Sequence, residues 1–81
     1  WSSDGCSSDL DKRLAAYLAD EYVKLGSDVI STTHEQIAKN LGTAREVVSR
    51  MLKYFEKEGL VALGRGTITI KNVSGLKKLL T

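Results

Sequence analysis

Residues 34–53, which read HEQIAKNLGTAREVVSRMLK, are the most informative part of the sequence about its fold. Its first part, His34–Leu41, predicts one helix, and a second helix is expected to open at Thr43 and run to about residue 58. Gly42 between them suits a tight turn, because glycine adopts backbone conformations that other residues avoid. Ala38 supplies the small side chain that closely crossing helices need. The side chains that such a crossing buries are Ile37, Leu41, Val48 and Met51. The stretch therefore predicts a helix-turn-helix.

The second helix separates its polar residues from its apolar ones. At about 100° per residue, the polar side chains fall within an arc of roughly 140°. They are Arg45, Glu46, Ser49, Arg50, Lys53, Glu56 and Lys57. The opposite side carries Ala44, Val47, Val48, Met51, Leu52 and Phe55. Any solvated amphipathic helix shows this separation. More specific is the position of two arginines, a glutamate and a serine in the first two turns, which a recognition helix presses against base edges in the DNA major groove.

The sequence before this stretch predicts one more helix. Residues 1–8 show no hydrophobic period and are expected to be a flexible N-terminal end or linker. A helix capped by Ser8 or Asp9 is expected to reach Leu25, where Gly26 ends it. The apolar stripe of this helix is Leu10, Leu14, Tyr17, Leu18, Tyr22 and Leu25.

Short β-prone stretches flank the helix-turn-helix. Residues 28–31 precede it, and residues 61–63 and 67–70 follow it on either side of Gly64-Arg65-Gly66, which is typical of a hairpin turn. Asn72 is expected to cap a last short helix. The apolar residues of that helix are Leu76, Leu79 and Leu80. The sequence therefore predicts a small α+β winged helix-turn-helix, with a three-helix core, a β-hairpin wing and a short C-terminal helix, in one domain over residues 9–81.

Residues 43–53, TAREVVSRMLK, and residues 55–61, FEKEGLV, carry a family resemblance. They resemble the DNA-binding domain of the Crp–Fnr family of bacterial transcription regulators, and the resemblance extends from about Leu10 to about Leu80. It implies a domain that binds double-stranded DNA. It also implies a longer protein with an N-terminal β-roll sensor domain and a dimerisation helix outside this chain. That protein is expected to be a homodimer that can contact RNA polymerase. Any effector would bind the sensor domain, so no cofactor is expected in this chain.

The resemblance also implies which side chains touch DNA. Arg45, Glu46 and Arg50 correspond to the positions that read base edges. The spacing of Glu46, Ser49 and Arg50 is similar to the Fnr-like branch of the family, whereas Arg45 is similar to the cyclic AMP receptor branch. A half-site with a TGA core suits both branches. The side chains expected on the DNA backbone are Thr33, Thr43, Ser49, Lys53 and Arg65.

Several of these residues also have a purely structural interpretation. Thr33 and Thr43 each precede a glutamine or glutamate by three residues, which predicts capping boxes, although helix N-termini also bind phosphates. Arg50 follows Glu46 by one turn, and such an ion pair stabilises a helix by only a few tenths of a kcal/mol. Arg45 is alternatively a solvated first-turn residue. The residues expected to face water are His34, Lys77 and Lys78.

Composition and charge agree with a cytoplasmic nucleic-acid-binding domain. The chain has 81 residues, 42% of them hydrophobic, which is enough to fold as one domain without metal or disulfide. The single cysteine, Cys6, has no metal-ligand spacing around it. No apolar run in the sequence reaches the length needed to cross a bilayer, and no secretory leader is expected. Residues 1–28 carry a net charge of −3, from three basic and six acidic groups. Residues 29–81 carry nine basic and four acidic groups, a net charge of +5, and phosphate attracts such a region.

Other classes of protein fit this sequence less well. Enzymatic catalysis needs a base oriented against a nucleophile or a second carboxylate, and the acidic residues here are scattered over predicted helix surfaces. An enzyme is therefore not expected. The alternative is a winged helix that binds another protein and has no base-specific contacts. The cluster of Arg45 and Arg50 argues against that alternative, and a flat salt dependence of duplex binding would support it.

Overall fold

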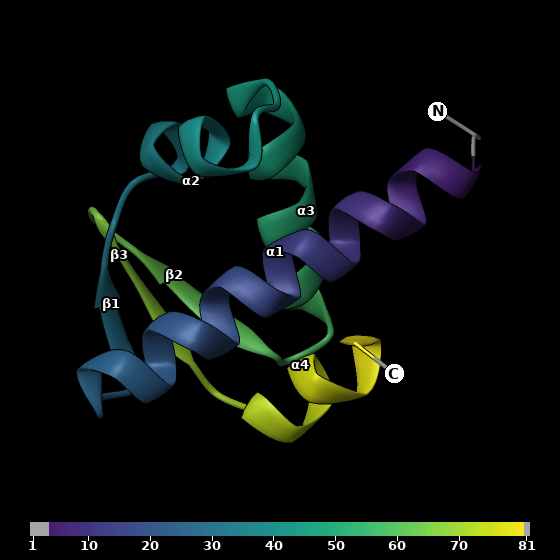
Figure 1. Cartoon of the computed structure of the whole chain (residues 1–81). Helices are drawn as coiled ribbons and strands as arrows, with labels where there is room; N and C mark the ends of the chain where they lie inside the picture. Colours follow the sequence, from purple (N-terminus) through teal and green to yellow (C-terminus); the bar gives the residue numbers. More distant parts are fainter. Residues whose placement is uncertain (1–3, 81) are drawn as a thin grey trace.

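The computed structural model describes the backbone of residues 4–80 and the side chains of residues 10–80 (Figure 1). Its elements are α1 (Asp4–Leu25), β1 (Val29–Ser31), α2 (His34–Leu41), α3 (Arg45–Lys57), β2 (Val61–Gly64), β3 (Thr67–Ile70) and α4 (Val73–Leu80). Over these residues, the order of helices and strands is that of a winged helix-turn-helix. The predicted α+β fold class is confirmed.

The hydrophobic core lies between α1, the sheet and α3. In Figure 1, α1 passes in front of the sheet, and it packs against α4, β1 and α2, while α3 packs against α2 and β2. The side chains with almost no exposed surface are Leu14, Leu18, Ile30, Ile37, Val48, Leu52, Phe55, Val61, Ile68 and Leu76. They come from all seven elements, so each element contributes an apolar face to the same core.

The three strands form an antiparallel sheet in the order β1-β3-β2. Ile68 of the central strand is paired with Ile30 on one side and with Leu63 on the other. The predicted hairpin is confirmed, with Gly64 paired to Thr67 and only two residues, Arg65 and Gly66, at the turn. A turn this short fixes the register of the strands and places Arg65 at the tip of the wing.

The turn between α2 and α3 forms as the sequence predicts. Gly42 has a φ of +70°, the left-handed conformation that suits glycine. Its N–H and that of Thr43 both donate to the carbonyl of Ala38, the second at 3.0 Å. Ala38 is 6% exposed, as a close approach of two helices requires. At the other end of α2, Thr33 Oγ1 accepts the N–H of Gln36 at 3.2 Å, so the predicted cap at Thr33 is confirmed.

The start of α3 differs from the prediction. The helix begins at Arg45, and its N-cap residue is Ala44, without a side-chain cap hydrogen bond. Thr43 lies one residue before this cap, and its N–H donates to the carbonyl of Ala38 at the end of α2, so this N–H is not available to the Glu46 carboxylate. The predicted capping box between Thr43 and Glu46 is therefore wrong.

Two predictions about α1 are also wrong. The helix begins at Asp4 and not at Ser8 or Asp9, so residues 4–8 are helical and not irregular. Residues 1–3 lie outside the described residues, and the domain boundary at residue 8 stays a prediction. Leu25, which was placed in the apolar stripe of this helix, is 54% exposed because it is the last residue of α1, where the chain turns at Gly26 toward β1.

Candidate nucleic-acid interface

The outward face of α3 carries the predicted base-reading residues. Val48, Leu52 and Phe55 are fully buried on the other side and fix the rotation of the helix. Arg45, Glu46 and Arg50 are thereby left exposed. Together with Ser49, these three residues line one open depression of about 440 Å³. The structure therefore brings together the residues that the sequence predicted as a group.

The charged side chains of this depression make no ion pairs with one another or with any other residue that the structure describes. Among the described residues, no hydrogen bond or ion pair joins Arg50 to Glu46 or engages Arg45. An intrahelical ion pair therefore does not explain Arg50. Both guanidinium groups keep their donors for a ligand, and a planar guanidinium suits bidentate acceptors.

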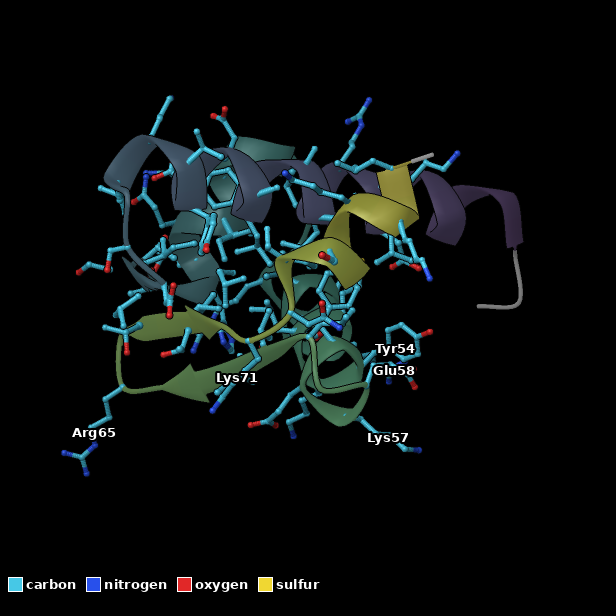
Figure 2. The ribbon with its side chains drawn as sticks, turned by 90° about the horizontal axis from the view of Figure 1, so that it is seen from below. Tyr54, Lys57, Glu58, Arg65 and Lys71 are labelled. Atoms are coloured by element: carbon cyan, nitrogen blue, oxygen red, sulfur yellow. The ribbon has the colours of Figure 1, made fainter. Side chains whose placement is uncertain are left out.

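A second depression connects α3 to the wing. Its volume is about 390 Å³, and Thr33 from the start of α2, Arg45 from the start of α3, and Gly66 and Thr67 from the hairpin all line it. Two of the predicted contacts, Thr33 and Arg45, thus lie on one continuous surface with the wing. Arg65 projects from the hairpin tip into solvent (Figure 2).

The other predicted backbone contacts occupy different positions. Lys53 is exposed on α3, three residues after Arg50. Thr43 is half-buried in the turn between α2 and α3 and lines neither of these two depressions. Lys77 and Lys78 are exposed on α4, on a different element from the helix-turn-helix and the wing.

Two features of the site differ from, or are absent in, what the sequence predicts. His34, expected to face water, is half-buried, and its Nδ1 lies 2.7 Å from Ser49 Oγ in a hydrogen bond between α2 and α3. Thr32 is 8% exposed, and its hydroxyl has no hydrogen-bond partner within the described part of the chain. It lines the depression between α2 and the wing. The sequence offered one indication of the His34 contact. His34 lies in the first turn of α2, and in a helix-turn-helix this turn faces the second turn of α3.

None of the helices within residues 4–80 is both long and apolar enough to span a membrane. Among the side chains of residues 10–80, no group of three or more His, Cys, Asp or Glu is arranged to hold a metal ion.

The fold and this exposed basic face define a winged helix-turn-helix with an accessible recognition helix. The Crp-like helix-turn-helix domain matches residues 12–79 of the chain. The chain belongs to this family, and it is a DNA-binding domain of the Crp–Fnr type.

Known relatives support this assignment. The chain is 32% identical over 77 residues to transcriptional regulatory protein btr of Bordetella pertussis, covering 86% of this chain and 32% of btr. It is 33% identical over 54 residues to transcriptional regulator SdrP of Thermus thermophilus, covering 67% of this chain and 27% of SdrP. The chain thus spans about a third or less of the length of either regulator.

Solved structures share the fold. The crystal structure of a Eubacterium rectale protein assigned to the crp/fnr family of transcriptional regulators superposes with a TM-score of 0.84 at 48% identity, over 86% of this chain and 32% of that one. The catabolite activator protein of Thermus thermophilus superposes with a TM-score of 0.75 at 29% identity, over 93% and 36% of the two chains.

Proposed function

We propose that the chain binds duplex DNA with α3 in the major groove, and that Arg45, Glu46 and Arg50 read base edges. The observation that carries this proposal is the depression on α3, where these three charged side chains lie exposed and unpaired within the described residues. A guanidinium donates two hydrogen bonds to O6 and N7 of a guanine, and a carboxylate accepts one from a cytosine amino group.

We further propose that side chains around this depression contact phosphates. Thr33 lies at the N-terminus of α2, where the first backbone N–H groups have no partner in the helix and the helix dipole favours an anion. Ser49 and Lys53 lie on α3, Thr43 in the turn, and Arg65 at the wing tip. Such contacts orient the protein on the duplex without reading its sequence.

For the whole protein, we propose a cytoplasmic transcription regulator that acts by binding and not by catalysis. This proposal is supported by the relatives named as transcriptional regulators, of whose length this chain spans about a third or less. In the proposed regulator, a sensor domain N-terminal to this chain binds any effector, and this chain holds no cofactor. The protein is a homodimer on two half-sites about one helical turn apart, and RNA polymerase is a further partner.

The test is a titration of a labelled duplex with the chain at several salt concentrations, together with a selection over randomised half-sites. We expect the logarithm of the binding constant to fall linearly with the logarithm of the salt concentration, because bound phosphates release counterions. We also expect one half-site sequence to be enriched. Weak binding with a flat salt dependence and no enrichment would contradict the proposal and favour a winged helix that binds another protein.

A further inference from the structure

The hydrogen bond between His34 and Ser49 connects α2 to the proposed DNA-binding face. His34 is the first residue of α2, directly after the N-cap residue Thr33, and Ser49 lies between Glu46 and Arg50 on α3. Their Nδ1 and Oγ atoms are 2.7 Å apart, and both residues are half-buried. The bond therefore ties a residue next to one proposed phosphate contact, Thr33, to a second one, Ser49.

The position of Ser49 favours a phosphate over a base edge. Ser49 lines the same depression as Arg45, Glu46 and Arg50, and because its Oγ is hydrogen-bonded to the first turn of α2, it lies on the side of that depression nearest α2. In a docked helix-turn-helix, the first helix crosses the DNA backbone while the second enters the groove. The border between the two helices is thus where the backbone passes.

The chemistry of a phosphate then determines the direction of the His34–Ser49 bond. A serine hydroxyl has one proton to donate and two lone pairs to accept with. Phosphate oxygens only accept, so Ser49 has to give its proton to the phosphate. The hydroxyl oxygen is then left to accept from His34, which requires the proton of the imidazole to be on Nδ1.

We propose that His34 is a positioning residue that donates its Nδ1–H to Ser49 Oγ and so directs the Ser49 hydroxyl at a DNA phosphate. This role rests on the proposed function. In a chain of hydrogen bonds each bond polarises the next, so a hydroxyl that accepts from an imidazole is a better donor than a free one. The partner that the pair recognises is one phosphate group of the duplex, independent of base sequence.

A double-mutant cycle tests this proposal. His34→Ala and Ser49→Ala should each weaken duplex binding about threefold to tenfold, equally on all half-sites, since one net hydrogen bond is involved. In the Ser49→Ala background, His34→Ala should have almost no further effect. Gln36→Ala is the matched control, because Gln36 is a neutral, exposed side chain in the same turn of α2. It should leave binding unchanged.

Conservative variants separate positioning from a general loss of structure. Asparagine places an N–H donor the same number of bonds from Cα as Nδ1, whereas glutamine places it one bond further. His34→Asn should therefore restore most of the affinity, and His34→Gln should not. Thermal unfolding of each variant checks that the domain is folded. Equal affinities of the two variants, both as low as that of His34→Ala, would contradict the positioning role.

The protonation of the ring gives a readout that does not depend on affinity. In the DNA complex, nitrogen-15 NMR of His34 should show the proton on Nδ1, and a proton on Nε2 alone would overturn the proposal. Additive effects in the cycle would also overturn it, while leaving the phosphate assignment of Ser49 intact. A coupled effect confined to one base pair would instead keep the role of His34 and reject the phosphate assignment. If the wild-type chain did not bind duplex DNA at all, both the role of His34 and the proposed function would be wrong.

Discussion

The two faces of α3 belong to one helix of 13 residues and have opposite physical roles. Val48, Leu52 and Phe55 on the inward face have no exposed surface, whereas Arg45 and Arg50 on the outward face are exposed. Apolar burial stabilises the fold by about 25 cal/mol per Å², and exposed charges add little to stability. In the proposed function, stability and recognition are therefore carried by different side chains of the same helix, and substitutions should separate them.

The largest effect is expected for Phe55→Ala. Phe55 is fully buried, and its truncation should lower the free energy of unfolding by about 3–5 kcal/mol, through lost burial and the cavity left behind. Urea unfolding followed by circular dichroism measures this. Tyr54→Ala is the matched control, because Tyr54 is the neighbouring aromatic residue and is 50% exposed. Its ring lies 6.0 Å from that of Phe55, so its loss should cost under about 1.5 kcal/mol. Equal losses would contradict the division between the two faces.

On the outward face, Arg50→Ala should change binding and not stability. We expect a cost of roughly 1–3 kcal/mol on the preferred half-site and a relaxed preference at one G·C pair. Arg50→Lys keeps the charge but loses the planar fork, so it should restore affinity better than specificity.

A selection over randomised half-sites, with urea unfolding alongside, measures both quantities for Arg50. Lys53→Ala is the control, because Lys53 lies on the same exposed face. It should weaken all sequences alike. If the base preference of Arg50→Ala and Arg50→Lys matched that of the wild type, Arg50 would not read a base.

The turn between α2 and α3 is expected to affect both faces, because it sets how the two helices cross. Gly42→Ala should lower the free energy of unfolding by about 1–2 kcal/mol, the cost of a left-handed alanine. A Cβ there meets no atom within 4 Å, so backbone strain, and not a steric clash, is the cause of this loss. Gly42→Asn should lower the free energy of unfolding by less than Gly42→Ala does, since asparagine tolerates the left-handed conformation. Chemical denaturation of both variants tests this order, and a loss for Asn as large as for Ala would point to a cause other than φ.

The features that the sequence predicted correctly depend on local chemistry. The bounds of α2, its cap at Thr33 and the left-handed Gly42 follow from residues within a few positions of one another. The start of α3 was misplaced at Thr43, whose N–H donates to the carbonyl of Ala38 at the end of α2. The hydrophobic period does not show whether a residue between two helices belongs to the end of the first helix or to the start of the second.

Features that depend on the angle between elements were missed. The hydrogen bond between His34 and Ser49 spans 15 residues, and it forms only because α2 and α3 cross so that these two turns meet. The hydroxyl of Thr32, which has no hydrogen-bond partner among the described residues, is likewise buried by the arrangement of β1, α2 and the wing. The grouping of Arg45, Glu46, Ser49 and Arg50, by contrast, lies on one helix, and helical periodicity was enough to predict it.

The smallest effect is expected at the wing, which extends the outward face beyond α3. Arg65 is exposed at the tip of the hairpin. We expect its positive charge to attract DNA phosphates there, and nothing in its position favours contact with one particular base. Arg65→Ala should weaken binding similarly on all sequences and reduce the slope of log K against log salt by about 1.

Lys71 is the matched control, because it is an exposed basic residue just after β3, at the opposite end of that strand from the turn (Figure 2). Lys71→Ala should leave the slope unchanged. Titrations of both variants over a range of salt decide the question: equal slopes for the two variants would mean that overall charge, and not the wing tip, attracts the backbone. An effect of Arg65→Ala at a single base position would make the wing a second reader of sequence.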